Sequence, residues 1–382
     1  MRRLCAPLCI ILLISFIFIP SASAEERIPA APAVAAPSAL LMEKTTGDIL
    51  YEKNADEHLF PASITKIMTM LLIVEDVEAG RLSLDDIVTT GKRPSTFGGS
   101  CVYLEEGEQM SVREMLKCIA VVSANDCAVA MAEHISGNEE QFVARMNERA
   151  AALGLKDTHF TNCTGLFDDG RHYTCARDVA IMSQELIRHE MIKEFTTIWM
   201  DSIRGGEFGL SNTNKLVYWY PGCTGLKTGY TSTAGYCLSA TAERDGAEYI
   251  AVIMHASTSD ARNKDAMALL DYAFDRFSLC PLRSPEALPR VRVDMGKEKY
   301  VSLVYDGAEN AVIPKNSGEI RYDIKAEERV PAPVHQGDRL GTVTVKCGEK
   351  IVATLPLLSE SDAERIGYFG ILKRLAEGLI GL

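Results

Sequence analysis

The sequence predicts an α+β protein in which helices and an antiparallel sheet form one domain and short strands form a second. Apolar residues recur with the period of a helix from residue 64 to 72, and residues 111–153 also follow a mostly helical pattern. Residues 224–256 instead contain three stretches that are typical of strands. From Pro285 onward, short strand-like stretches are punctuated by glycines, which indicates a small separate β domain.

The composition is that of a globular protein. Of the 382 residues, 47% are hydrophobic and 24% are charged, which excludes wholesale disorder and fibrous repeats. The length corresponds to about two domains. With a net charge of −12, the chain lacks the overall positive charge that is typical of proteins that bind nucleic acid, so we expect no nucleic-acid partner.

The first 24 residues have the three parts of a secretory signal peptide. Arg2 and Arg3 form the charged start, an apolar run extends from Leu8 to Ile19, and Ala22-Ser23-Ala24 matches a cleavage site. The apolar run is too short to cross a bilayer, for which about 20 residues are needed. We therefore predict export, with a mature chain that begins at Glu25.

The cysteines and histidines show no disulfide, zinc or other metal pattern. Nine of the eleven cysteines lie in the predicted mature chain, an odd number, and no C-x-x-C occurs. Several lie in apolar stretches, as Cys118 does in Leu116–Val122, so we expect most to be small buried residues. The histidines lack ligand spacing as well, so we expect no metal and no cofactor.

The folded chain is expected to begin with a hairpin and a helix. Residues 25–37 are rich in alanine and proline and are expected to form a short tether. The strands Ala39–Met42 and Ile49–Tyr51 flank a turn and predict a β-hairpin. A helix is then expected to start near Pro61–Ser63, because apolar residues follow at i, i+3, i+4, i+7 and i+8.

The remaining elements complete one large domain and add a smaller one. We expect the large domain to span 38–280 and the β-rich domain to span 285–358. The large domain is expected to end with the strands Leu226–Thr231, Ala234–Ala242 and Tyr249–His255 and the helix Ala261–Phe277. The β-rich domain is expected to contain the strands Val291–Val293, Val301–Val304, Leu340–Val345 and Ile351–Leu355.

The last stretch, 362–382, predicts an amphipathic helix. Its hydrophobic content is too low for a helix that spans a bilayer, but the pattern suits a helix that lies in the membrane surface. The alternative is a helix packed on the β-rich domain. The expected apolar face consists of Ile366, Phe369, Leu372, Leu375, Leu379 and Ile380.

Three short motifs occur in order: Ser63-Ile64-Thr65-Lys66, Ser123-Ala124-Asn125 and Lys227-Thr228-Gly229. Alone, each has a plain explanation as a helix cap, a solvated lysine, a turn or a strand edge. The order of the three motifs and the elements on which they lie argue against all of these explanations being true at once. The first motif opens an amphipathic helix, the second lies in a region where a helix passes into a loop, and the third lies on a predicted strand.

The motifs suit nucleophilic catalysis by a serine. Ser63 and Lys66 share one helix face, and a serine hydroxyl becomes a nucleophile when a base takes its proton. Lys66 can be that base if burial or a neighbouring cation, such as Lys227, lowers its pKa. The N–H groups of Ser63 and Tyr230 could form an oxyanion hole.

The second and third motifs supply the other functions that such a site needs. Ser123 could relay a proton to the leaving group, and the Asn125 amide can both donate to and accept from a substrate amide. Lys227 and Thr228 could bind a substrate carboxylate.

With these motifs in this order, the chain resembles the D-alanyl-D-alanine carboxypeptidases, which are low-molecular-mass penicillin-binding proteins of the serine peptidase type. The resemblance runs over nearly the whole mature chain. It implies a β-lactamase/transpeptidase-like domain, namely an antiparallel sheet flanked by helices with a helical subdomain, followed by the all-β domain and a membrane-surface helix. The matching segments are Phe60–Thr69, Val122–Asp126, Leu153–Phe160, Ala176–Asp178, Asn212–Leu216, Gly225–Thr231 and Ala234–Tyr236.

The resemblance also implies roles for matched residues. Ser63 would form the acyl ester and Lys66 would accept its proton, while Arg262 would grip the terminal D-alanine carboxylate, for which a guanidinium is suited. The plain alternative for Arg262 is a surface residue at a helix start. One departure is Thr164, where a histidine is common in relatives. The implied cleft is completed by Ser123, Asn125, Lys227, Thr228, Gly229 and Tyr230.

The resemblance implies a serine D,D-carboxypeptidase at the outer face of the cytoplasmic membrane. It would remove the terminal D-alanine from peptidoglycan pentapeptide stems, and β-lactam antibiotics would acylate Ser63. A β-lactamase is an alternative, but the Glu-x-x-Leu-Asn-like motif of class A enzymes is absent between Ser123 and Lys227. A D,D-endopeptidase and a non-catalytic envelope protein that binds β-lactams or muropeptides are further alternatives.

Overall fold

The computed structural model of the chain describes residues 31–380, with side chains up to residue 376 in the last helix. The predicted signal peptide, 1–24, lies outside the described residues. The nine cysteines of the described part are free thiols, and seven of them are buried. This confirms the expectation that most cysteines are small buried residues.

The described part of the predicted tether is packed on the large domain. Val34 and Ala36 are buried, and the Ala36 N–H donates a hydrogen bond to a carboxylate oxygen of Asp265 at 2.8 Å. Residues 34–37 are therefore packed against the large domain, which the prediction of a short tether over residues 25–37 did not include. The compositional signal was misleading because alanine and valine fill small spaces against a helix as readily as they populate a linker.

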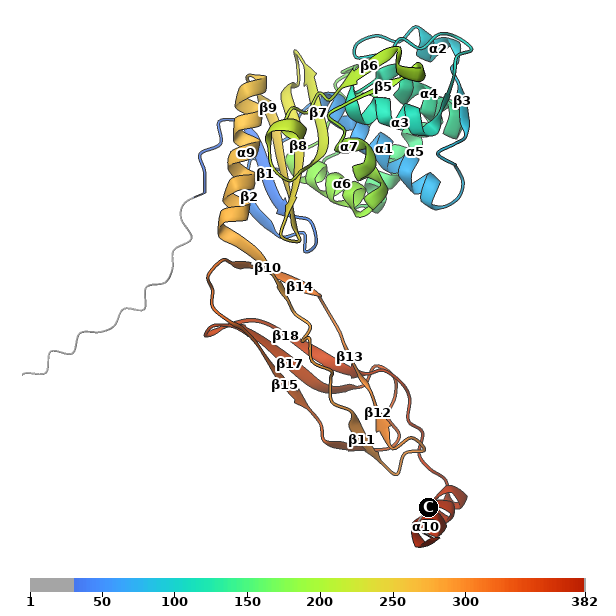
Figure 1. The fold of residues 1–382 in the computed structure, drawn as a ribbon, viewed down its shortest axis with the longest axis vertical. Coiled ribbons are helices and arrows are strands. Elements are labelled where there is room, and N and C mark those ends of the chain that lie inside the picture. The colour runs from blue at the N-terminus through green and yellow to red at the C-terminus, as the bar shows by residue number, and fades with distance from the viewer. Residues whose placement is uncertain (1–30, 381–382) are drawn as a thin grey trace, which may run out of the picture. The chain divides into compact units, whose positions relative to one another are not determined.

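The large domain is built on a five-stranded antiparallel sheet with the strand order β2-β1-β9-β8-β7 (Figure 1). The predicted hairpin and the three later strands are confirmed. The central strands are buried on both faces, whereas β7 is an edge strand that leaves alternate backbone groups without a neighbouring strand. The strands are β1 Ser38–Glu43, β2 Ile49–Lys53, β7 Cys223–Thr231, β8 Gly235–Arg244 and β9 Ala247–Ala256.

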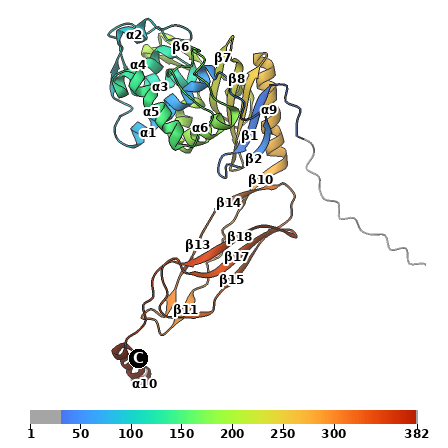
Figure 2. The same ribbon diagram turned by 180° about the vertical axis from the view of Figure 1, so that it is seen from behind.

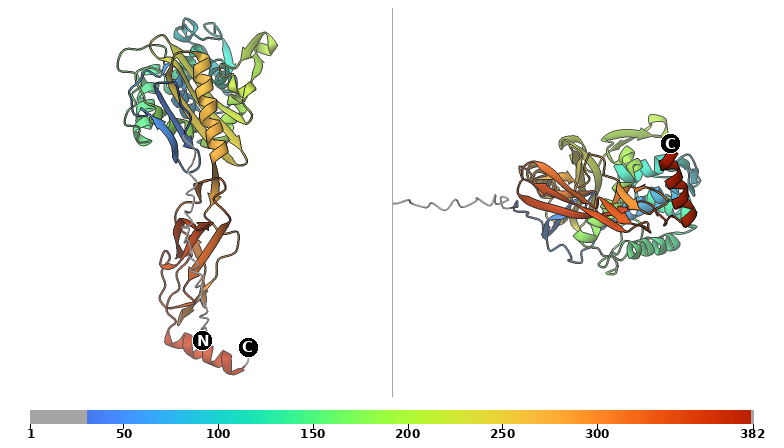
Figure 3. Two further views of the ribbon diagram at one scale, coloured as in Figure 1. Left: turned by 90° about the vertical axis from the view of Figure 1, so that its left-hand side faces the viewer. Right: turned by 90° about the horizontal axis from the view of Figure 1, so that it is seen from below.

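Helices cover both faces of this sheet. One face carries a helical layer whose buried side chains form the largest apolar core, and α9 packs on the other face (Figures 2 and 3). Almost every side chain of α1 is buried, because α1 lies between the sheet and the other helices. The helices are α1 Lys66–Glu78, α3 Val112–Val121, α4 Asn125–Ser136, α5 Glu139–Ala152, α6 Ala176–Arg188 and α9 Ser259–Arg276.

Shorter elements connect the main ones. The helix predicted to start near Pro61–Ser63 is confirmed as α1, but its first residues form a 3₁₀ turn, η1, so Ser63 lies on that turn rather than within the α-helix. The short elements are η1 Ala62–Thr65, β3 Ile87–Thr89, α2 Lys92–Ser95, β4 Gln109–Ser111, η2 Glu190–Ile192, α7 Lys193–Thr196, β5 Met200–Ile203, η3 Arg204–Gly206, β6 Phe208–Ser211 and α8 Leu216–Trp219.

The C-terminal region is all-β, as predicted, with its own apolar core that includes Val291, Val343 and Leu357. Its strands form a sheet of order β13-β18-β17-β15, a sheet of order β12-β11-β16 and the pair β10-β14. The prediction missed β10, β14, β15 and β16. The strands are β10 Phe277–Pro281, β11 Val291–Asp294, β12 Tyr300–Val301, β13 Leu303–Tyr305, β14 Asn310–Pro314, β15 Ile320–Ala326, β16 Arg329–Pro331, β17 Arg339–Cys347 and β18 Lys350–Ser359.

The chain continues into the helix α10, Tyr368–Ile380. Four large apolar side chains of α10 are exposed: Tyr368, Phe369, Leu372 and Leu375. The side chains of Leu379 and Ile380, which belong to the predicted apolar face, lie outside the described ones. Within residues 31–380, no helix combines the length and apolarity that crossing a membrane requires.

Candidate active site

Ser63 is presented on a strained turn in front of the edge strand β7. Ala62, directly before it, has a φ of 47°, which costs an L-residue about 1–2 kcal/mol. From Pro61 to Met70, Ser63 is the single residue that is not buried. A Cβ atom on Gly229 would lie 2.9 Å from the Pro61 carbonyl oxygen, so glycine in the third motif lets β7 approach the turn.

Lys66 lies beneath Ser63 and is fully buried. Its Nζ donates to Ser63 Oγ at 3.0 Å, to Asn125 Oδ1 at 2.6 Å and to the Thr164 carbonyl oxygen at 2.9 Å. Burial lowers the pKa of Lys66 to about 7. A neutral amine can keep two N–H bonds, to Asn125 and Thr164, and turn its lone pair toward the Ser63 hydroxyl.

The second motif lies in the connection between α3 and α4. Ser123 has a φ of 62° and is buried, and its Oγ has no hydrogen-bond partner among the described residues. Asn125 is held by a bond from its Nδ2 to the Gly98 carbonyl at 2.8 Å, which aims its Oδ1 at Lys66. Leaving a buried hydroxyl unpaired costs about 1–3 kcal/mol, so Ser123 is placed for an external partner.

The third motif runs along β7. Lys227 is buried, and its Nζ donates to the Thr228 carbonyl at 2.9 Å. Burial lowers the pKa of Lys227 well below its usual value, and the charges of Lys66 and Arg262 lower it further. Beyond Gly229, the side chain of Tyr230 is 56% exposed.

Thr213 joins the second and third motifs. Its N–H donates to the Val121 carbonyl at 3.0 Å, at the end of α3, and its hydroxyl accepts a bond from Thr228 Oγ1 at 2.8 Å. These two hydrogen bonds therefore join the sheet to the helical layer next to the second and third motifs. This residue lies in a segment that matched the family, but sequence reasoning gave it no role.

Arg262 lies at the start of α9, next to the strand β8 residue that pairs with Gly229 of the third motif. It is buried and donates to Asn263 Oδ1 at 3.0 Å, to Ser259 Oγ at 3.2 Å and to the Cys237 carbonyl at 3.5 Å. The alternative of a surface residue is therefore wrong. Its charge acts on Lys227, but its role toward a substrate stays a prediction.

Sequence reasoning also missed the loop that places the third acceptor of Lys66. Asn162 Oδ1 accepts from the N–H of Thr164 at 3.2 Å and of Gly165 at 2.7 Å, a turn that leaves the Thr164 carbonyl facing Lys66. Asn162 with Gly165 three residues later is a combination that favours a turn and could have suggested this loop. The function comes from a backbone oxygen, which no residue type encodes.

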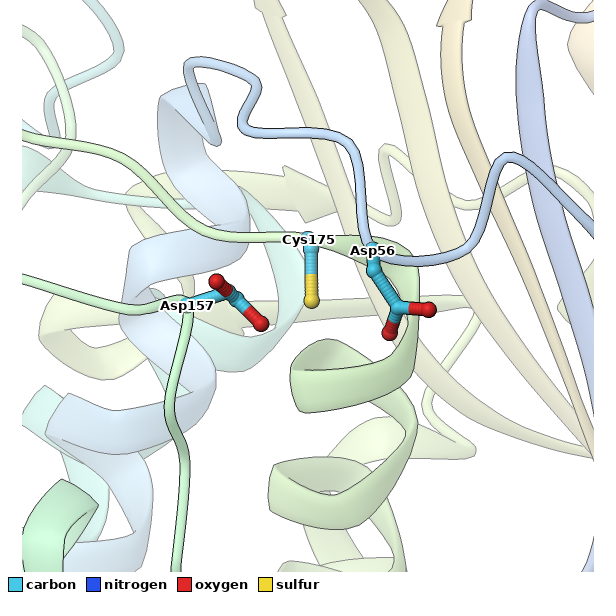
Figure 4. Close-up of side chains that lie close together, drawn as sticks. All are labelled: Asp56, Asp157 and Cys175. Carbon is cyan, nitrogen blue, oxygen red and sulfur yellow. The ribbon is translucent and has the colours of Figure 1, made fainter.

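A second cluster of polar side chains, which contains two carboxylates and a thiol, lies outside the three motifs. Asp56, Asp157 and Cys175 lie close together (Figure 4). Asp56 is already bound by Arg177 at 2.6 Å and Asp157 by His58 at 2.7 Å. Burial raises the pKa of Cys175 to about 12, so its thiol is protonated. The arrangement is explained by these pairings without a metal ion.

Comparison with known proteins identifies the family of the chain. A family model described as D-alanyl-D-alanine carboxypeptidase matches residues 25–258, and a model of the penicillin-binding protein 5 C-terminal domain matches residues 285–365. The chain is 42% identical to the D-alanyl-D-alanine carboxypeptidase DacF of Bacillus subtilis, over 98% of this chain and 98% of that protein.

Solved structures give the same result. Penicillin binding protein 5 from Haemophilus influenzae matches with a TM-score of 0.77 at 30% identity, covering 88% of this chain and 99% of that one. Penicillin-Binding Protein D2 from Listeria monocytogenes, solved in its ampicillin bound form, matches with a TM-score of 0.59 at 31% identity, covering 64% of this chain and 100% of that one.

The predicted fold class and the predicted type of enzyme are thus confirmed. Both the sheet-and-helix domain and the all-β domain have counterparts in the penicillin-binding proteins. The family match covers more than half of the chain, and the Bacillus subtilis relative matches almost all of it. The chain therefore belongs to the D-alanyl-D-alanine carboxypeptidase family of serine peptidases.

Proposed function

We propose that the protein removes the terminal D-alanine from peptidoglycan pentapeptide stems through an acyl-enzyme on Ser63. The observation that carries this proposal is the contact of 3.0 Å between Lys66 Nζ and Ser63 Oγ. Because burial brings the pKa of Lys66 to about 7, a large fraction of the lysine is neutral at physiological pH and can accept the serine proton.

The reaction starts when Lys66 accepts the Ser63 hydroxyl proton and Oγ attacks the carbonyl carbon of the penultimate D-alanine. The N–H groups of Ser63 and Tyr230 stabilise the oxyanion that forms. The C–N bond to the terminal D-alanine breaks as its nitrogen takes a proton, which Ser123 relays from the Lys66 ammonium. Lys66 then takes a proton from a water molecule, which attacks the ester carbonyl carbon. The bond between that carbon and Ser63 Oγ breaks, the shortened stem leaves with a free carboxyl group, and Lys66 returns the proton to Ser63 Oγ.

The substrate carboxylate is assigned to the basic side of the cleft. Lys227 and Thr228 lie on β7 before Gly229, so the terminal residue lies toward the start of that strand and the rest of the stem lies toward Tyr230. Arg262 supplies positive charge from behind the sheet. This arrangement suits a peptide that ends in a carboxylate one residue after the scissile bond.

A β-lactam would acylate the same serine as a substrate mimic. The Listeria monocytogenes relative solved in its ampicillin bound form supports this assignment. We favour slow release of the drug over β-lactamase turnover, because no class A deacylation motif lies between Ser123 and Lys227. A D,D-endopeptidase differs in the leaving group alone and uses the same residues.

The first experiment is acylation by benzylpenicillin, followed by intact mass and peptide mapping. We expect one long-lived adduct on Ser63, lost in Ser63→Ala and retained in the control Ser361→Ala, an exposed serine of the C-terminal region. The same proteins should differ in D-alanine release from a pentapeptide. Folded protein that takes up no adduct and releases no D-alanine would favour a non-catalytic binding protein, and an adduct lost within one turnover would favour a β-lactamase.

We further propose that the protein acts outside the cytoplasmic membrane, with α10 lying in the membrane surface. The four exposed apolar side chains of α10 support this placement, since exposing them to water is unfavourable.

Vesicle flotation tests this proposal. The double substitution Phe369→Glu with Leu372→Glu should abolish binding of the mature chain to the vesicles. The control Ile351→Glu replaces an exposed apolar residue of β18 and should leave binding intact. Equal flotation of all three proteins would contradict a membrane role for α10.

A further inference from the structure

His172 is a buried histidine that the proposed reaction does not use. It is 1% exposed and lies in the loop that also holds Thr164 against Lys66. The rings of Phe60 and Phe160 pack against it edge-on, with centroids 5.6 and 5.8 Å away. Such a side chain needs hydrogen bonds from the protein, and their partners identify its task.

The partners of His172 fix which nitrogen carries the proton. Nδ1 accepts the backbone N–H of Thr161 at 3.0 Å, so the proton of the neutral ring is on Nε2. Nε2 lies 2.8 Å from Thr65 Oγ1 and therefore donates to it. The Thr65 hydroxyl in turn donates to the Ala62 carbonyl oxygen at 2.8 Å. A directed chain thus runs from His172 through Thr65 to Ala62.

Burial keeps His172 neutral by lowering its pKa to about 4. The charges of Asp169 and Asp168 oppose this shift, and His159 reinforces it. The ring is therefore an uncharged donor throughout the neutral range. The chain of hydrogen bonds persists under the conditions in which Lys66 acts as a base.

The chain of hydrogen bonds ends at the carbonyl oxygen of the peptide unit between Ala62 and Ser63, which directly precedes the nucleophile. The Ala62 C=O and the Ser63 N–H belong to the same planar peptide and point in opposite directions. Fixing the Ala62 oxygen therefore aims the Ser63 N–H. Gly165 closes the other side, because a Cβ atom there would lie 1.8 Å from the Ala62 oxygen.

We infer that His172 and Thr65 are positioning residues that hold the Ala62–Ser63 peptide so that the Ser63 N–H faces the developing oxyanion. The inference rests on the proposed role of Ser63 as nucleophile. The loop after Asn162 thus has a second role. It carries no histidine at position 164, but it carries His172, which holds Thr65. Neither residue touches the substrate, so both act through the peptide that they fix.

The test compares variants that remove or keep each hydrogen bond. Thr65→Val has nearly the same shape but no hydroxyl, and Thr65→Ser keeps the hydroxyl. His172→Ala removes the donor, and His172→Gln retains an N–H. We expect Thr65→Val and His172→Ala to lower kcat for D-alanine release roughly 10- to 100-fold with KM nearly unchanged, because a displaced oxyanion donor weakens transition-state binding.

Rescue and additivity sharpen the result. Thr65→Ser and His172→Gln should recover much of the rate, and the double variant Thr65→Val/His172→Ala should be no slower than either single one, because both interrupt the same chain. His335→Ala, an exposed histidine of the C-terminal region, is the matched control and should act like the parent. Full additivity in kcat would contradict a shared chain.

A spectroscopic measurement separates positioning from loss of folding. The ester carbonyl of the penicilloyl-enzyme should stretch at a lower frequency in the parent than in folded Thr65→Val, because the Ser63 N–H polarises it. Variants that melt earlier but keep the parent's kcat and carbonyl frequency would overturn the inference. A parent protein that is neither acylated nor active would overturn the proposed function instead.

Discussion

At the scale of single residues, the charge state of one buried amine controls the reaction. The Lys66 amine has three acceptors around it and no contact with bulk solvent. Water would hold a lysine pKa near 10.4, and desolvation brings this one to about 7. The sequence suggested Lys227 as an alternative cause, but burial accounts for the shift.

The resulting pH dependence has a definite sign. The base is the neutral amine, so the rate constant for acylation by penicillin should rise with pH and reach half of its plateau near pH 7. Stopped-flow acylation between pH 5 and pH 9 measures this profile. Lys66→Arg, which stays charged, should be inactive throughout. A flat profile in the parent would show that Lys66 does not take the serine proton.

A second prediction concerns Ser123, whose replacement should lower the activity without lowering the stability. Its buried hydroxyl has no partner among the described residues, so Ser123→Ala removes an unsatisfied group and should leave the melting temperature unchanged or raised. The same change removes the proton relay and should lower kcat by at least about tenfold. Calorimetry and D-alanine release measure the two effects. A variant that is less stable but fully active would assign Ser123 to the structure alone.

The nucleophile, the base and the substrate-facing strand could be predicted because side-chain chemistry at short spacing encodes them. The spacing of three residues between Ser63 and Lys66 survives even though Ser63 lies on a 3₁₀ turn. The Thr164 carbonyl and the His172 chain could not be predicted in the same way. They depend on how a loop without periodicity folds back on the turn, and the acceptors involved are backbone oxygens.

At the scale of elements, the site depends on the contact between β7 and η1. Gly229 is a glycine for reasons of space: a Cβ atom would lie 2.9 Å from the Pro61 oxygen and 3.1 Å from the Ile64 nitrogen. Both neighbours are backbone atoms that cannot rotate away. Any side chain at this position therefore separates the strand from the turn that bears the nucleophile.

Gly229→Ala should lower the acylation rate at least about tenfold, because the Tyr230 N–H moves away from the Ser63 N–H with which it shares the oxyanion. Gly209→Ala on β6 is the control, since nothing lies within 4 Å of its Cβ position. Acylation kinetics with a fluorescent penicillin, combined with melting curves, measure both. Parent-like acylation in a folded Gly229→Ala protein would mean that the cleft tolerates this separation.

Element prediction was most accurate where a segment is rich in buried apolar residues. The helix α1 and the strands β1 and β9 are mostly buried, whereas the residues of β14, β15 and β16 are half-exposed or exposed. The boundary after α9 failed for another reason. Phe277 continues the apolar face of the helix in sequence, but in the structure it begins β10, which pairs with β14. Strand pairing over such a distance leaves no local signal.

At the scale of the whole molecule, the buried polar groups that catalysis requires lower the stability of the fold. Lys66, Lys227 and Arg262 are all nearly inaccessible to solvent, and burial lowers the pKa of each. Such groups are costly to bury. The apolar core of the helical layer on one face of the sheet and the core beneath α9 on the other supply the buried apolar area that offsets this cost.

The buried histidine adds a measurable acid sensitivity to the stability of the catalytic domain. His172 has a pKa of about 4 in the folded chain and about 6.5 when unfolded, so the unfolded state binds more protons between these values. Its contribution is complete above pH 6.5 and is lost as the pH falls toward 4, by at most about 3 kcal/mol. Asp168 and Asp169 favour the charged ring and limit this loss, and His159 increases it.

Urea unfolding of the parent and of His172→Gln from pH 4 to pH 7 tests the effect. Unfolding is monitored by the fluorescence emission of the two tryptophans, both of which lie in the large domain. The parent should lose more stability than the variant over this window. Parallel losses would assign the acid sensitivity to the carboxyl groups instead.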